Sequence, residues 1–162
     1  EESKCSFVIL RPNWFMDNFH TIWLAPIQEA GILPLPAAEG RASFIDSRDV
    51  AACAAAALRN DGLSRRTFAL TGPEALTHGE AASVISSAAG REIAYVPVDD
   101  VSFMNSLVET GVSASYAAYI TGLFRWTRSG AAARVTTDVQ ELIGRAPRTL
   151  SEYVQDHAGE WR

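Results

Sequence analysis

Apolar residues gather in short continuous runs and in longer segments with one apolar side. Residues 5–10 and 67–71 are short runs rich in branched and aromatic side chains. Such runs are typical of strands covered on both faces, as in a parallel sheet. Residues 92–98 are a third candidate strand, which Pro97 places at a sheet edge. Residues 32–41 read as a loop, and residues 42–45 as a short extended segment.

Helices are predicted between these runs. Asn13 can cap a helix over residues 14–30, and Asp46 or Ser47 can cap a buried helix over residues 48–58. Helices are also expected over residues 100–110 and 113–127, the second with an apolar stripe. Capping boxes, in which a Thr hydroxyl and a Glu or Gln side chain satisfy the first amides, are expected at Thr77–Glu80, Thr137–Gln140 and Thr149–Glu152.

The chain contains too few predicted strands for strands that are buried on both faces. A strand buried on both faces needs neighbours, yet residues 67–71 are the only comparable partner for residues 5–10. Two strands do not make a sheet that is stable alone in water. We therefore expect the chain to be the later part of a larger fold, with its partner either a missing N-terminal half or a second copy of the chain.

Composition narrows the class of protein. The 162 residues suffice for one domain, and the net charge of −5 lacks the basic surface of a nucleic-acid binder. Cys5 and Cys53 are expected as buried thiols in a reducing compartment. No signal peptide is visible, and the apolar run at residues 51–58 is too short to span a membrane. We expect a cytoplasmic protein that binds neither membrane nor nucleic acid.

Catalytic patterns are sparse. The three histidines lie in separate segments without metal-ligand spacing, and His78 is expected to be exposed within its capping box. Asp46 and Asp49 suit the N-terminus of a helix better than an acid/base pair. No G-x-S-x-G nucleophile motif occurs. The aromatic residues of 113–127 suit helix packing better than a substrate lid.

Several short motifs, in their order along the chain, resemble the later part of NmrA-like proteins, which are atypical short-chain dehydrogenase/reductase relatives. They are Leu10-Arg11-Pro12-Asn13-x-Phe15-Met16-x-Asn18, Phe44-Ile45-Asp46-x-Arg48-Asp49-Val50-Ala51, Leu70-Thr71-Gly72-Pro73-Glu74-Ala75-Leu76-Thr77, Val135-Thr136-Thr137-Asp138-Val139 and Gly144-Arg145-x-Pro147-Arg148-Thr149-Leu150. Each motif is loose alone, and their joint order is the specific feature.

The resemblance implies an α/β fold, namely the C-terminal portion of a Rossmann-type parallel-sheet protein plus a small, mostly helical substrate lobe. Residues 1–75 would be the last strands and helices of the dinucleotide-binding domain, and residues 76–162 the substrate lobe. The implied cofactor is NADP or NAD. Its phosphate-binding loop would lie in the missing N-terminal half, because no two of the 11 glycines are two or three residues apart.

The segment after the first strand carries the implied site. Pro12, Asn13 and Phe15 would border the nicotinamide end of the cofactor, at the carboxyl end of a parallel strand. Trp14, Met16 and Asn18 would bind the substrate, a small-molecule acceptor, and the helices over residues 99–127 would close over it. The sequence assigns no catalytic residue and no metal ligand.

The resemblance leaves three functions open. The first is an NAD(P)H-dependent oxidoreductase acting on a quinone-like or other conjugated acceptor, inactive as this chain alone. The second is a non-catalytic, NAD(P)-sensing regulatory or interaction protein, favoured by the lack of an obvious acid/base residue. The third is a relative of the sugar-nucleotide epimerases. That option needs a Tyr-x-x-x-Lys pair, which this chain lacks, since its sole lysine is Lys4.

Overall fold

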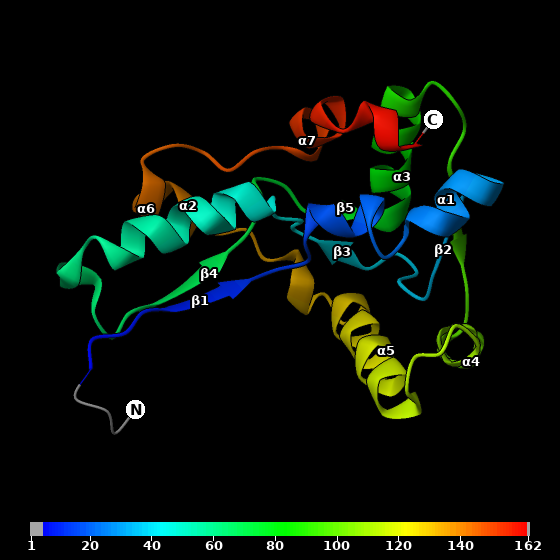
Figure 1. The fold of residues 1–162 in the computed structure, drawn as a ribbon, viewed down its shortest axis with the longest axis horizontal. Helices are drawn as coiled ribbons and strands as arrows, with labels where there is room; N and C mark the ends of the chain where they lie inside the picture. Colours follow the sequence, from blue (N-terminus) through cyan, green and yellow to red (C-terminus); the bar gives the residue numbers. More distant parts are fainter. Residues whose placement is uncertain (1–4, 162) are drawn as a thin grey trace.

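The computed structural model describes residues 5–161 as short strands surrounded by helices (Figure 1). In chain order the elements are β1 (Ile9–Pro12), η1 (Met16–His20), α1 (Leu24–Ala30), β2 (Ile32–Leu35), β3 (Arg41–Ala42), α2 (Ser47–Leu58), η2 (Asp61–Leu63), β4 (Thr67–Leu70), β5 (Leu76–Thr77), α3 (His78–Ala89), β6 (Ala94–Pro97), α4 (Asp100–Glu109), α5 (Ala114–Arg128), η3 (Ala131–Ala133), α6 (Asp138–Ile143), α7 (Leu150–Asp156) and η4 (Ala158–Trp161). No helix within these residues is both long and apolar enough to cross a membrane.

The strands of the described residues pair in twos. β1 lies parallel to β4 with Leu10 opposite Phe68, and β2 lies parallel to β6. β3 and β5 form a short antiparallel pair. Figure 1 shows β1, β4 and α2 as an arm on one side of the molecule, with α4 and α5 as a separate pair of helices below the centre. The sheet around which the arm is built is therefore small.

The core has two parts. The arm encloses a small cluster in which Ile45, Cys53, Phe68, Leu70 and Val139 are buried. The larger cluster joins α1, α3, α5 and α7 through aromatic side chains, among them Phe19, Phe44 and Phe124. This larger cluster holds residues from both sides of position 75, so the domain boundary proposed there stays a prediction.

Elements specified by local signals form as predicted. Thr77 and Glu80 make the capping box, since the Thr77 hydroxyl accepts from the Glu80 amide at 3.0 Å and Glu80 accepts from the Thr77 amide at 2.8 Å. The capping box at Thr149 is also confirmed. The strands expected near residues 67–71 and 92–98 appear as β4 and β6, and the helices over residues 100–110 and 113–127 appear as α4 and α5.

The first strand differs from the expectation. It begins at Ile9 rather than Cys5, and the Cys5 side chain is exposed rather than buried. Its two faces are half-buried or exposed, not covered. The reason is physical: among the described residues β1 has only β4 beside it, so the preceding residues have little to bury against.

The segment after β1 also differs. Asn13 caps no helix, because its side chain bonds to Ser43 and to the Ala132 carbonyl instead. The long helix expected over residues 14–30 is replaced by η1 and α1, with Pro26 inside α1. The loop expected at residues 32–41 contains β2 and Arg41, the first of the two residues of β3.

Three predictions based on helix ends or burial are wrong. Helix α2 is capped by Asp46 as expected, yet only Asp49 and Cys53 of it are buried, and Leu58 is 87% exposed. Thr137 makes no capping hydrogen bond. His78 is 0% exposed rather than solvent-facing, because Trp14, Phe44 and other aromatic rings enclose it.

Candidate functional site

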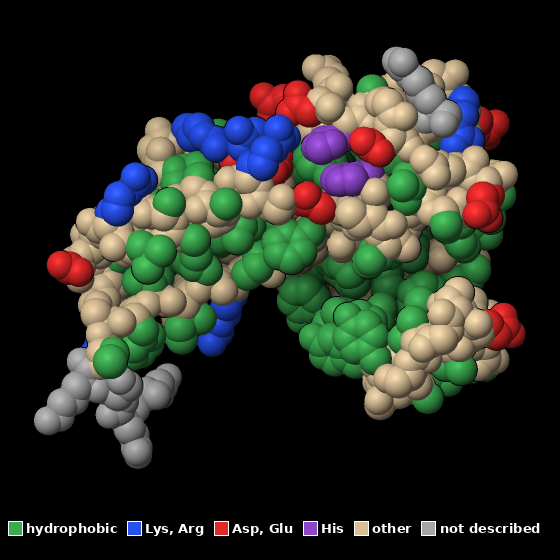
Figure 2. All heavy atoms as spheres, viewed as in Figure 1, with side chains coloured by type: hydrophobic (Ala, Val, Ile, Leu, Met, Phe, Trp, Pro, Cys, Tyr) green, Lys and Arg blue, Asp and Glu red, His purple; other side chains and the backbone are tan. Residues whose placement is uncertain are grey.

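A cleft of about 430 Å³ opens between the end of β1 and helix α5. It is lined by Pro12, Asn13, Trp14, Phe15, Asn18, Ile22, Tyr116, Tyr119, Ile120, Leu123 and Trp126. Figure 2 shows hydrophobic side chains gathered around the hollow between the arm and the lower pair of helices. The cleft thus lies beyond the carboxyl end of a parallel strand, where open α/β sheets bind ligands.

The first wall of the cleft consists of Pro12, Asn13, Trp14, Phe15 and Asn18. A short strand-like pairing that follows β1 shapes it. Beyond Pro12 the chain forms an isolated parallel bridge between Phe15 and Ile45. The Met16 amide donates to the Ile45 carbonyl at 2.9 Å, and the Ile45 amide donates to the Trp14 carbonyl at 2.8 Å. Successive side chains of extended backbone point to opposite faces. Phe15 therefore faces the cleft at 36% exposure, while Met16, at 1%, enters the core.

Asn13 holds this wall in place. Its Nδ2 donates to the Ser43 hydroxyl at 2.7 Å and to the Ala132 carbonyl at 2.8 Å. Its Oδ1 accepts from the Trp14 amide at 2.8 Å. Because both donors and the carbonyl are engaged within the chain, Asn13 lines the cleft as a fixed, hydrogen-bonded group.

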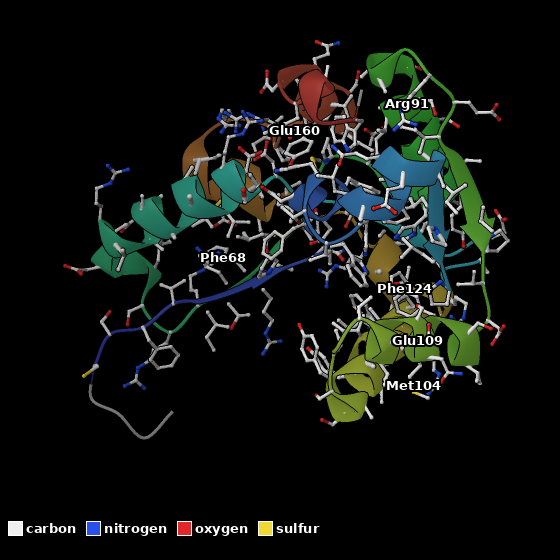
Figure 3. The ribbon with its side chains drawn as sticks, turned by 45° about the vertical axis from the view of Figure 1, so that its right-hand side comes forward. Phe68, Arg91, Met104, Glu109, Phe124 and Glu160 are labelled. Atoms are coloured by element: carbon white, nitrogen blue, oxygen red, sulfur yellow. The ribbon has the colours of Figure 1, made fainter. Side chains whose placement is uncertain are left out.

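The second wall is the apolar side of α5. Ser113 caps this helix through a bond from the Tyr116 amide, and the stripe then places Ile120 and Leu123 toward the cleft. Tyr116 and Tyr119 stay 56% and 60% exposed, with their rings stacked at 6.1 Å between centroids and 28° between planes. Phe124, labelled in Figure 3, is fully buried where α5 meets the core.

A buried aromatic cluster lies behind the first wall. The Trp14 ring lies 4.9 Å from Phe124 and 6.5 Å from His78 between centroids. Burial lowers the pKa of His78 to about 4, so the imidazole is neutral at pH 7. Neither ring nitrogen of His78 has a hydrogen-bond partner within residues 5–161. Uncharged aromatic rings therefore lie behind the first wall of the cleft.

The structure brings most of the predicted site residues together. Pro12, Asn13, Trp14, Phe15 and Asn18 all line the cleft, and Met16 does not. Ile22 and the α5 residues join them, although the sequence favours plain helix packing for the aromatic residues of α5. Helical spacing identifies that stripe, but it does not show that part of the stripe stays open.

The cleft border fits one end of a dinucleotide, the nicotinamide. Pro12 and Phe15 form a flat apolar border at a strand end, which suits a nicotinamide ring. A pyrophosphate needs closely spaced glycines that let backbone amides approach it. No two glycines of the chain have that spacing, so the G-x-G-x-x-G form of this loop does not occur in it. Pro12 and Phe15 are the residues of this cleft that could hold the nicotinamide end of NAD(P).

Sequence comparison finds relatives among oxidoreductases, while no family model matches the chain. The uncharacterized oxidoreductase YesF of Bacillus subtilis is 36% identical over 156 residues, covering 96% of this chain and 54% of YesF. The NAD(P)H azoreductase of Xenophilus azovorans is 32% identical over 158 residues, covering 98% of this chain and 55% of that enzyme. The chain spans about half the length of the curated relatives it matches.

Solved structures show the same fold. The NADPH-dependent quinone oxidoreductase of Escherichia coli superposes with a TM-score of 0.83 at 23% identity, covering 96% of this chain and 56% of that one. The Citrobacter triphenylmethane reductase complexed with NADP(H) gives 0.79 at 25% identity, over 94% of this chain and 53% of that one. NmrA, a negative transcriptional regulator in complex with NAD, gives 0.69 at 15% identity, over 96% and 53%.

These findings define a class. The chain has an α/β fold that matches Rossmann-like, NAD(P)-binding reductases, and its relatives and structural neighbours are NmrA-like proteins and NAD(P)-dependent reductases. The resemblance carried by the motifs is confirmed to that extent.

Proposed function

We propose that this chain works in an NAD(P)H-dependent oxidoreductase of the NmrA-like type, which reduces a quinone-like or other conjugated acceptor. The observation that carries the proposal is the aromatic cleft at the carboxyl end of β1, with Phe15 and Trp14 on one wall and Tyr116 and Tyr119 on the other. Flat apolar walls with few polar groups suit a planar conjugated molecule. Oxidoreductase relatives at 36% and 32% identity support the reaction class.

Each residue of the cleft has a role in this proposal. The cofactor, NADP or NAD, would supply the hydride. Pro12, Asn13 and Phe15 would border its nicotinamide end, with Asn13 fixing the backbone there through its two donated bonds. Trp14 and Asn18 would contact the acceptor. Met16, which lies in the core, would support the floor from beneath.

The rest of the dinucleotide site would come from residues outside this chain. β4 is covered on its outer edge, where Ala69 donates its amide to Asp138 at 2.7 Å and accepts at its carbonyl from the Thr136 hydroxyl at 2.5 Å. Ile9 and Asn13 donate their backbone amides toward the β4 side of the ladder. Peptide groups alternate in direction along a strand of a parallel pair, so those of Leu10 point away from β4. That open edge would take a further strand, from a missing N-terminal half or from a second copy.

The test is NADH and NADPH oxidation by the complete gene product against a panel of quinones, beside the 162-residue chain alone. We expect turnover by the complete protein, and neither turnover nor tight NADPH binding by the chain alone. Phe15→Ala should reduce turnover, whereas Val135→Ala, a change at an exposed side chain outside the cleft lining, should not. Tight NADPH binding by the isolated chain would contradict the missing-half part of the proposal.

A second candidate is an NAD(P)-sensing regulator that performs no reaction. The observation favouring it is that the cleft lining contains no Asp, Glu, His, Lys or Cys, so the two tyrosine hydroxyls are the ionisable groups in it. Cofactor binding by the complete protein with no oxidation across the panel would select the sensor. The epimerase alternative is weaker, because no tyrosine of the described residues has a lysine four positions later.

A further inference from the structure

We propose that the cleft selects uncharged planar acceptors and rejects anionic ones, with Tyr116 and Tyr119 as the specificity-determining wall. This inference rests on the proposed function in taking the cleft as the acceptor site. It goes further because it assigns the charge of the acceptor and the residues that determine this selectivity.

The first observation is the absence of charge from the lining. None of the residues that form the cleft is charged. The arginines of α5 point elsewhere, since Arg125 pairs with Asp100 at 2.7 Å and Arg128 pairs with the same carboxylate at 3.0 Å. An anion that leaves water without meeting a cation or several donors is strongly destabilised. A sulfonate or carboxylate on the acceptor would meet no cation among the residues that line this cleft.

The second observation concerns the polar groups that remain available. The amide of Asn13 and the indole N–H of Trp14 are already engaged, the latter with Thr127 at 2.9 Å. Of the other lining side chains, the polar groups are the Asn18 amide, the two tyrosine hydroxyls and the indole N–H of Trp126. These neutral groups can each bond a carbonyl or hydroxyl. They are too few to replace the hydration of an ionised group.

The third observation is the geometry of the tyrosine pair. Tyr116 and Tyr119 are neighbours on one helix face, with nearly parallel rings and more than half of each side chain exposed. Phe15 belongs to the opposite wall. Aromatic rings bind other flat rings in offset or edge-on arrangements at similar centroid distances. Phe15 and the tyrosine pair would therefore supply the ring surfaces that a flat ligand contacts in the cleft.

A direct binding measurement separates charge selection from turnover. The probes are 2-methyl-1,4-naphthoquinone and 1,4-naphthoquinone-2-sulfonate, which share a ring system and differ in charge. Binding to the complete protein is followed by quenching of tryptophan emission, since Trp14 and Trp126 line the cleft. We expect the sulfonate to bind at least about tenfold more weakly, a difference of about 1.4 kcal/mol.

Two variants test the wall itself. Tyr119→Arg adds a cation at a side chain that is 60% exposed on a helix, so it should fold normally and shift the preference about tenfold toward the sulfonate. Combined Tyr116→Ala and Tyr119→Ala should weaken binding of the neutral quinone about tenfold. Val135→Ala, exposed and outside the cleft lining, is the matched control and should leave both affinities unchanged.

The outcomes distinguish this inference from the proposed function. Equal or tighter binding of the sulfonate, no binding of either probe, or an unchanged preference in Tyr119→Arg would overturn the inference, even if the protein oxidises NADPH. The expected preference without any NAD(P)H oxidation would support the inference and count against the oxidoreductase.

Discussion

The indole nitrogen of Trp14 donates a hydrogen bond to the hydroxyl of Thr127, 2.9 Å away and 113 residues later in the chain. Thr127 is fully buried and donates in turn to the Leu123 carbonyl at 3.1 Å. The two walls of the cleft are thereby joined directly, one through its tryptophan and the other through α5. This contact holds Trp14 against α5, while the bonds of Asn13 to Ser43 and Ala132 hold the preceding residue.

Thr127→Val should weaken that junction. The substitution removes the acceptor for the indole N–H, so the free energy of unfolding should fall by about 1–2 kcal/mol. Urea unfolding followed by fluorescence measures it. Thr110→Val is the matched control, because the Thr110 hydroxyl is exposed and bonds only within its own helix end. A loss as large in the control as in Thr127→Val would contradict the assignment.

Asp49 should be among the most sensitive charged positions. Its carboxylate is 0% exposed and accepts from Arg145 at 2.6 Å and from the Arg148 amide at 2.7 Å. Asp49→Asn leaves two arginines without their buried partner and should lower the free energy of unfolding by about 3 kcal/mol. Asp156→Asn breaks an exposed pair with Arg48 and should lower it by less than about 1 kcal/mol. Equal effects in thermal unfolding would disprove the distinction.

His78 should make stability depend on pH in the acid range. Burial lowers its folded pKa to about 4 from 6.5, so between these values the unfolded chain binds a proton that the folded chain does not. The free energy of unfolding therefore falls as the pH falls through this window, and the full stability is present above about pH 6.5.

His78→Phe removes that titration and keeps a ring in the aromatic cluster. Between pH 7 and pH 4.5 the original protein should lose about 2 kcal/mol more than the variant in urea unfolding. The carboxylates titrate in both proteins, so the difference isolates the histidine. Parallel pH profiles for the two proteins would refute the prediction.

Two glycines should respond in opposite ways to alanine. A Cβ on Gly72 would lie 1.9 Å from the Phe44 carbonyl oxygen, so Gly72→Ala must displace backbone and should destabilise by more than about 2 kcal/mol. Gly122 lies within α5 with nothing within 4 Å of an added Cβ. Gly122→Ala should stabilise by about 0.5–1 kcal/mol, measured as a higher melting temperature. Similar shifts in both variants would be inconsistent with this structure.

Local signals predicted the parts of the fold that depend on neighbours in sequence. The capping box of Thr77 and Glu80 is decided within four residues, and it formed as expected. The exposure of His78, in the same box, depends on Trp14 and Phe44, which arrive from other segments. The sequence therefore located the start of the helix correctly and misjudged the burial of its first residue.

In the candidate site, too, features decided by neighbours in sequence were predictable and features decided by distant contacts were not. The run from Pro12 to Asn18 was recognisable as a strand end followed by aromatic and amide side chains, and most of it lines the cleft. The fate of Asn13 was not predictable from spacing, because its partners Ser43 and Ala132 lie 30 and 119 residues away. The alternation that buries Met16 follows from the bridge to Ile45, another contact distant in sequence.

The two borders of the β1–β4 ladder are not equivalent. Thr136 and Asp138 occupy the border of β4 with side chains, whereas β1 turns the backbone of Leu10 outward. The unpaired peptide groups of an edge strand are where a further strand adds by main-chain hydrogen bonding, and at Ala69 of β4 these groups are already engaged. If the proposed further strand joins this sheet, it would therefore lie beside β1, and β4 would be the terminal strand.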